Sequence, residues 1–182
     1  MHNMTKRKYD FSEILIDEHT LAKRIAELGA QITNDYKGEN ILLVGILKGS
    51  IPFIADLMRK IDVDDIQIDY MSVSSYGHST KSSGVVRILK DLDSDIKGRN
   101  VIIVEDIIDT GLTLAYLKEY LQGRAPKSLK ICTLLDKPLR RKVEIKGDYV
   151  GFEVEDKFIV GYGLDIDQKY RNLPYISWIP ID

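Results

Sequence analysis

Apolar residues recur along this chain at two different spacings, one typical of helices and one typical of buried strands. After Asp17, the residues Leu21, Ile25, Leu28 and Ile32 lie three or four positions apart, which predicts a helix with one buried stripe and an Asp17 cap. A second helix is predicted after Ser50, which would cap it, with Pro52 in its first turn. A third helix is predicted from residue 112 onward. Short runs rich in β-branched residues predict strands at 41–46, 66–73, 85–89, 101–104 and 128–135.

Strands that alternate with helices in this way predict an α/β fold with a central, mostly parallel sheet flanked by helices. After residue 136 the pattern changes to short β segments at 149–154 and 158–160, followed by a tail rich in Gly and Asp. We therefore expect a single domain over 1–182, with a core at about 36–136. A small hood is expected from the N-terminal segment and about 137–182. Ligands of such sheets bind beyond the carboxyl ends of the strands.

Composition narrows the class of protein. The 182 residues are 44% hydrophobic, and 26 Lys and Arg nearly balance 28 Asp and Glu, so we expect no nucleic-acid partner and no membrane surface. The basic N-terminus at residues 1–9 is not followed by an apolar segment typical of a signal peptide. The single cysteine, Cys132, lies in an apolar run and reads as a buried residue in a reducing compartment. These features predict a cytoplasmic protein.

The segment 101–113 combines a buried strand, two adjacent acids and a turn of small residues that leads into a helix. The acids are Glu105 and Asp106, and the turn is Asp109-Thr110-Gly111. Backbone N–H groups and the positive end of the helix dipole converge at such a turn. The segment therefore predicts a phosphate site with carboxylates beside it.

This segment resembles the signature of the type I phosphoribosyltransferases, and its Glu105-Asp106-Ile107-Ile108-Asp109-Thr110-Gly111 sequence resembles their hypoxanthine-guanine branch. The resemblance extends from about Leu43 to Arg171. It implies the type I phosphoribosyltransferase fold and a purine salvage enzyme that transfers the 5-phosphoribosyl group of phosphoribosyl pyrophosphate to hypoxanthine or guanine, forming IMP or GMP. It also implies Mg²⁺ as cofactor and a homo-oligomer, a dimer or a tetramer.

The resemblance assigns the phosphoribosyl site to the signature segment. Glu105 and Asp106 would hold the ribose hydroxyls and Mg²⁺, whose hard oxygen ligands suit carboxylates. Asp109 would be the general base near N7 of the purine, whereas its residue type alone would also suit the N-cap of the following helix. A phosphate beside it would raise its pKa by like-charge repulsion. The 5-phosphate would be bound by Thr110, Gly111, Leu112 and Thr113.

The pyrophosphate site is implied at three separate places. Lys48 and Gly49 follow the strand at 41–46, where Lys-Gly alone would be an ordinary turn. Ser75 and Tyr76 belong to the polar segment 74–84, which we expect to act as a lid that excludes water. Arg171 would pair with two pyrophosphate oxygens.

The purine pocket is implied by residues nearer the C-terminus. Lys137 would donate to O6, and an ammonium group, which only donates, would reject the 6-amino group of adenine. Phe158 would stack on the base and the backbone of Ile159 would read its edge, although a lone aromatic more often belongs to the core. Asp165 would bind a second Mg²⁺ or the exocyclic amine of guanine. The basic residues 140–142 read as a solvated face.

Two other functions remain open. A related enzyme could use another base such as xanthine, adenine or orotate. A non-catalytic regulator of the same fold could bind nucleotide or RNA, although RNA would require a basic face that the near-neutral composition does not supply.

Overall fold

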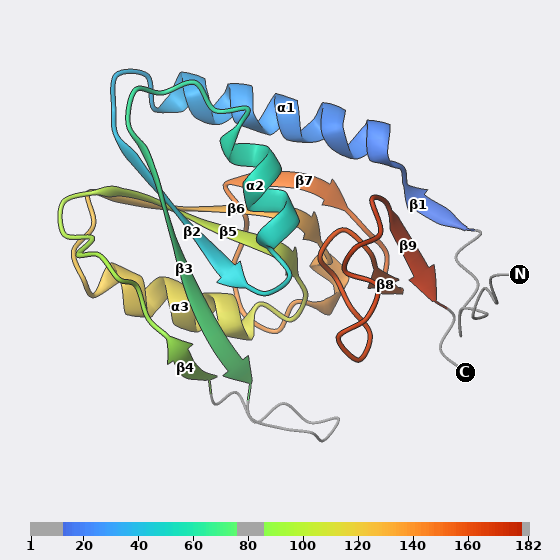
Figure 1. The fold of residues 1–182 in the computed structure, drawn as a ribbon. Helices are drawn as coiled ribbons and strands as arrows, with labels where there is room; N and C mark the ends of the chain where they lie inside the picture. The colour runs from blue at the N-terminus through green and yellow to red at the C-terminus, as the bar shows by residue number, and fades with distance from the viewer. Residues whose placement is uncertain (1–12, 76–85, 180–182) are drawn as a thin grey trace, which may run out of the picture.

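The computed structural model describes residues 13–75 and 86–179. Its main sheet has six strands in the order β4-β3-β2-β5-β6-β7, all parallel except the edge strand β4 (Figure 1). The strands are β2 (Ile41–Leu47), β3 (Ile66–Ser75), β4 (Val86–Lys90), β5 (Asn100–Ile108), β6 (Ser128–Asp136) and β7 (Tyr149–Glu153). The predicted α/β architecture is confirmed.

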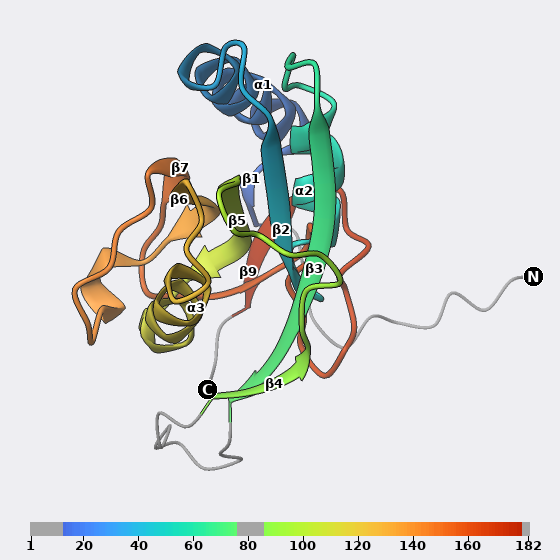
Figure 2. The same ribbon diagram turned by 90° about the vertical axis from the view of Figure 1, so that its left-hand side faces the viewer.

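Helices cover both faces of this sheet because its strands are apolar on both sides. The helices α1 (Glu18–Asp35) and α2 (Ile51–Met58) pack on one face, against side chains such as Leu43 and Ile102. The helix α3 (Leu112–Gln122) packs on the other face, against neighbours such as Leu42 and Ile103. In Figure 2, α1 lies at the top of the view and α3 lies lower down, with β5 and β6 at heights between them.

A second, three-stranded antiparallel sheet in the order β1-β9-β8 forms a hood beside the main sheet. It combines β1 (Ile14–Ile16) from the N-terminal part with β8 (Phe158–Val160) and β9 (Ile176–Ile179). The assignment of 149–154 to the hood is wrong, because β7 pairs in parallel with β6 and extends the main sheet. The core therefore reaches beyond the expected limits of 36 and 136, and it also includes the buried stripe of α1.

One local expectation is confirmed and two need correction. Asp17 caps α1 as predicted, accepting from the Thr20 amide at 2.7 Å. Ser50 stands at the start of α2 but makes no side-chain cap. Its hydroxyl donates instead to the Ile46 carbonyl at 2.7 Å. The strand with the two acids continues to Ile108, so Glu105 and Asp106 lie within a strand, just beyond Val104, the last residue that pairs with β2.

The strand order places a crevice between β2 and β5. From β2 the chain crosses through α2 to β3 on one side, and from β5 it crosses through α3 to β6 on the other. Loops that leave neighbouring strands in opposite directions open a gap at the carboxyl ends of those strands. The residues that follow β2 and the acids of β5 meet at this gap.

Candidate active site

The loop after β2 and the end of β5 are in direct contact at the crevice. A Cβ atom added at Gly49 would overlap the carboxylate of Asp106. A Cβ at Gly163, whose φ is +100°, would overlap the carbonyl oxygen of Gly49. The peptide bond between Leu47 and Lys48 in the same loop is cis. Three segments far apart in the sequence therefore approach one another so closely that only glycine fits at two of the contacts.

Glu105 and Asp106 form a partly buried acid pair at this point. Burial raises the pKa of Glu105 well above its usual range, and the adjacent Asp106 charge adds to this effect. Burial also raises the pKa of Asp106, although the hydrogen bond with Glu105, the Ile107 amide and the charge of Arg171 oppose it. The pair therefore favours protons, a cation or hydroxyl donors as partners.

The acid pair offers the hard oxygen ligands that Mg²⁺ prefers. Among the residues that the structure describes, no three His, Cys, Asp or Glu side chains lie close enough together to hold a metal ion. A Mg²⁺ ion here would therefore need further oxygen ligands from substrate or water, as is usual for this ion. Asp165 is not grouped with the pair, because it forms an ion pair with Arg171 at 2.8 Å and accepts from the Gln168 amide at 2.8 Å.

The predicted phosphate turn lies at the start of α3. Gly111 is the cap residue, with a φ of 81°, so Asp109 does not cap the helix. Glu105, Asp109, Thr110, Gly111 and Thr113 contribute to the lining of a hollow of about 110 Å³. The first amides of a helix have no carbonyl from a preceding turn to bond. An anion placed in this hollow would meet them together with the positive end of the helix dipole.

The segment after Lys137 closes over this turn, which sequence reasoning missed. Arg140 Nε donates to Asp109 Oδ1 at 3.0 Å, and Arg141 Nη1 donates to the Asp109 carbonyl at 2.6 Å. Arg141 is largely buried and also pairs with Asp136. The expectation of a solvated face at 140–142 is therefore wrong for Arg141 and incomplete for Arg140, because acceptors on the phosphate turn attract the guanidinium groups.

The residues predicted for the purine lie at the edge between the main sheet and the hood. Lys137 follows β6 and is only 8% exposed, with its ammonium donating to the Lys157 carbonyl at 2.6 Å. Phe158 begins β8 and is 36% exposed, whereas Ile159 is buried. A large aromatic side chain that remains this exposed offers a surface for a flat ligand.

Two of the predicted pyrophosphate residues, Lys48 and Arg171, come together at Gln168. Its side-chain oxygen accepts from Lys48 Nζ at 3.4 Å and from Arg171 Nη2 at 3.1 Å. Arg171 also donates to the Gly163 carbonyl at 2.7 Å, so it is fixed to the loop that packs on Gly49. Ser75 ends β3, and Tyr76 lies outside the described residues.

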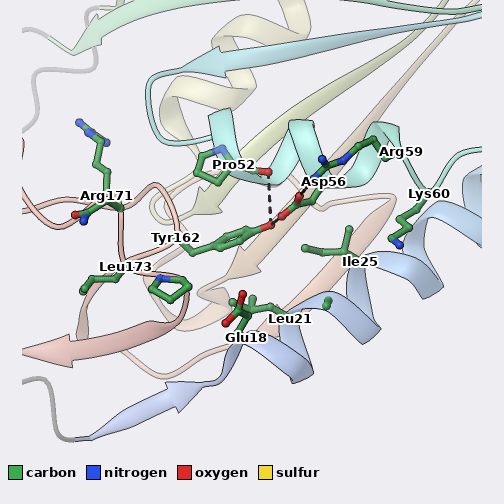
Figure 3. Close-up of a pocket in the computed structure, with 13 residues that line it drawn as sticks. Glu18, Leu21, Ile25, Pro52, Asp56, Arg59, Lys60, Tyr162, Arg171 and Leu173 are labelled. Atoms are coloured by element: carbon green, nitrogen blue, oxygen red, sulfur yellow. Dashed lines mark hydrogen bonds and ion pairs between the residues drawn. The ribbon is translucent and has the colours of Figure 1, made fainter.

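A larger cavity, of about 590 Å³, lies away from the acid pair, between α1, α2 and the segment that leads to β9. Figure 3 shows Tyr162 reaching across it toward Asp56 and Pro52, with Arg171 nearby. Tyr162 donates to Asp56, and burial followed by this contact raises the pKa of the phenol. The bond ties the hood segment to α2 and so supports the Gly163–Gly49 contact. Neither member of the acid pair lines this cavity, whereas Glu105 lines the smaller hollow at the phosphate turn.

Several contacts at the site had no signal in the sequence. Arg140, Gln168 and Tyr162 each make a side-chain contact with a residue remote in sequence. The partners are Asp109, Lys48 and Asp56, which are 31, 120 and 106 positions away. Arg140 and Arg141 are adjacent and chemically alike. Spacing alone could not show that both turn toward Asp109.

The comparisons with known proteins agree with this arrangement. The phosphoribosyl transferase domain family matches residues 12–167. A hypoxanthine-guanine phosphoribosyltransferase of Bacillus subtilis is 55% identical over 170 residues, covering 93% of this chain and 94% of that protein. The hypoxanthine phosphoribosyltransferase of Escherichia coli K12 is 53% identical, covering 91% and 93%. A crystal structure of a hypoxanthine-guanine phosphoribosyltransferase from Bacillus anthracis has a TM-score of 0.90 at 51% identity, covering 94% of this chain and 100% of that one.

The fold is that of the enzymes that transfer phosphoribosyl groups. The chain belongs to the phosphoribosyltransferase family, among the hypoxanthine-guanine phosphoribosyltransferases. No helix within 13–75 or 86–179 has the length and hydropathy needed to cross a membrane.

Gly49→Ala tests the close approach at the crevice. Because the new methyl group would displace the Asp106 carboxylate, we expect phosphoribosyl transfer to a purine to slow by roughly 100-fold. Gly123→Ala is the matched control, since its Cβ would lie 3.4 Å from the nearest atom, and it should keep activity within about twofold. Equal activity of the two variants in a steady-state assay would contradict the contact.

Proposed function

We propose that the protein transfers the 5-phosphoribosyl group from phosphoribosyl pyrophosphate to N9 of hypoxanthine or guanine, giving IMP or GMP and pyrophosphate. The proposal is supported by the contact between the Gly49 backbone and the Asp106 carboxylate, and by the hollow that the adjacent Glu105 lines together with the phosphate turn. The high identity to relatives named for this reaction supports it. Purine salvage is the process that this reaction serves.

The first task of the site is to hold the phosphoribosyl group. The amides of Gly111, Leu112 and Thr113 and the hydroxyls of Thr110 and Thr113 bind the 5-phosphate. Glu105 and Asp106 accept hydrogen bonds from the ribose hydroxyls, which relieves the unfavourable burial of the two carboxylates. The sugar is thereby fixed with its anomeric carbon toward the purine.

The second task is to recognise the base and take its proton. Lys137 donates to O6 with donors that remain after its bond to the Lys157 carbonyl. Phe158 stacks on the ring, and the backbone of Ile159 contacts its edge. Asp109 accepts the proton from N7 as the bond at N9 forms. Asp165 is proposed to contact a second Mg²⁺ or the guanine amine.

The third task is to stabilise the leaving pyrophosphate. Lys48, the Gly49 amide and Arg171 converge from two loops, and Ser75 and Tyr76 are proposed to complete the enclosure. A Mg²⁺ ion held by Glu105 and Asp106 would supply Lewis-acid stabilisation of the charge that develops on the leaving group. The described groups bind and orient the substrate while enclosure limits attack by water.

The competing functions are separable by assay. Comparing kcat/KM for hypoxanthine, guanine, xanthine, adenine and orotate identifies the base, and a preference for any of the last three would overturn the proposed substrate class. A regulator without catalysis would turn over none of them. The dimeric or tetrameric state and the cytoplasmic location remain predictions.

Asp109→Asn tests the general base. Loss of the carboxylate should lower kcat by roughly 10- to 1,000-fold with a smaller effect on KM, because proton removal fails while binding contacts remain. Steady-state kinetics with hypoxanthine measure both parameters. An unchanged kcat would remove Asp109 from this role.

Lys137→Ala tests recognition of O6. The variant should lose at least about tenfold in affinity for hypoxanthine or guanine, since a charged donor is removed. Its affinity for phosphoribosyl pyrophosphate should change by less than about threefold. Titration of each substrate by calorimetry gives both numbers, and equal losses would contradict the pocket assignment.

Removal of Mg²⁺ tests the cofactor. Excess EDTA should abolish turnover, and added Mg²⁺ should restore it, because the leaving group would otherwise carry its charge without compensation. Full activity in EDTA would exclude the metal from the reaction.

A further inference from the structure

A chain of alternating charges connects the two side chains proposed to recognise the purine. Arg140 Nε donates to Asp109 Oδ1 at 3.0 Å, and Arg140 Nη1 donates to Asp156 Oδ2 at 3.3 Å. The other oxygen of Asp156 lies 3.9 Å from Lys137 Nζ. The order along this chain is Asp109, Arg140, Asp156, Lys137, with opposite charges at every step.

The two ends of this chain have linked tasks in the proposed reaction. N7 and O6 of a 6-oxopurine project from the same edge of the rings, so Asp109 and Lys137 must be held at a separation that suits both atoms. A small misplacement of such groups costs catalysis more than it costs folding. Asp109 lies on the turn before α3, whereas Lys137 follows β6. The backbone bond from the Lys137 amide to the Ile108 carbonyl, at 2.9 Å, fixes the main chains but not the side chains.

The segment that carries Arg140 is attached to the phosphate turn by bonds that do not involve the Arg140 side chain. Arg141 donates to the Asp109 carbonyl, and the Lys142 amide donates to the Thr110 carbonyl at 2.9 Å. The side chains of Asp109, Arg140 and Asp156 are 42%, 45% and 50% exposed. Ion pairs this exposed contribute little to stability. Their removal should therefore leave the loop in place and the protein folded.

We propose that Arg140 and Asp156 are positioning residues that set the separation between Asp109 and Lys137 and thereby determine the efficiency with which a 6-oxopurine is used. This inference rests on the proposed function, which gives Asp109 and Lys137 their roles. Neither Arg140 nor Asp156 needs to touch the substrate. Both act through the orientation of their partners.

The test uses Arg140→Gln, Arg140→Lys and Asp156→Asn in the full-length protein. Arg140→Gln should lower kcat/KM for hypoxanthine by roughly 10- to 100-fold, because Asp109 and Lys137 lose their common link. The KM for phosphoribosyl pyrophosphate should stay within about threefold, since no pyrophosphate contact changes. Arg140→Lys should recover part of the loss by keeping the charge. A merely structural role would not separate the two substrates.

Lys127→Gln is the matched control. Lys127 forms an exposed ion pair with Glu39 at 2.7 Å, before the amino end of β6. Its loss should leave both kinetic constants within about twofold. Thermal unfolding of every variant should show an unchanged folded fraction.

The double variant of Arg140→Gln with Asp156→Asn tests whether the two residues act as one unit. If they do, the double variant should lose little more than Arg140→Gln alone. Additive losses, or kcat/KM for hypoxanthine within about twofold of wild type in both single variants, would overturn the inference. If Asp109→Asn and Lys137→Ala show their expected losses in that case, the inference fails alone. If those two variants are also unimpaired, the proposed function fails.

Discussion

The contact between the Gly49 backbone and the Asp106 carboxylate is the constraint on which the rest of the site depends. It brings the loop after β2 against the end of β5 where the strand order reverses, so groups from both sides of the sheet face one crevice. A side chain at position 49 would occupy the place of the carboxylate. Gly163 is under the same steric constraint, because a Cβ atom there would overlap the Gly49 carbonyl oxygen where the hood segment meets the loop after β2. The phosphate turn, the acid pair and the cationic groups therefore surround backbone positions where no side chain larger than that of glycine fits.

The charges at the site are held by partners within the chain. Lys48 and Arg171 share the Gln168 side chain, Arg140 bridges Asp109 and Asp156, and Lys137 donates to a backbone carbonyl. In each case the proposed ligand would replace or extend an existing polar contact, so these side chains lie close to their substrate-binding positions before the substrate binds. Such preorganisation lowers the cost of ordering side chains when substrate binds. The partly buried acid pair is the exception, since desolvation raises the pKa of both carboxyls and leaves the pair suited to a cation or to hydroxyl donors.

Much of the fold followed from local patterns because its strands and helices have clear apolar periods. The stripe of α1, the buried runs of β2 and β5 and the turn before α3 each carried their own signal. The placement of β7 did not, because five residues of mixed burial fit a hood as well as an edge strand and only pairing with β6 decides. The same limit applies to the site. The signature segment predicted Glu105, Asp106 and Asp109 as site residues. The bonds of Arg141 to the Asp109 carbonyl and of Lys48 to the Gln168 side chain were not predictable, because they join segments remote in sequence.

A crystal structure with IMP or GMP bound tests the central claim most directly. We expect the 5-phosphate within hydrogen-bonding distance of the amides at the start of α3, the ribose hydroxyls on Glu105 and Asp106, and O6 at Lys137. A nucleotide bound elsewhere, for instance in the large cavity between α1 and α2, with the crevice at Gly49 and Asp106 empty, would contradict it.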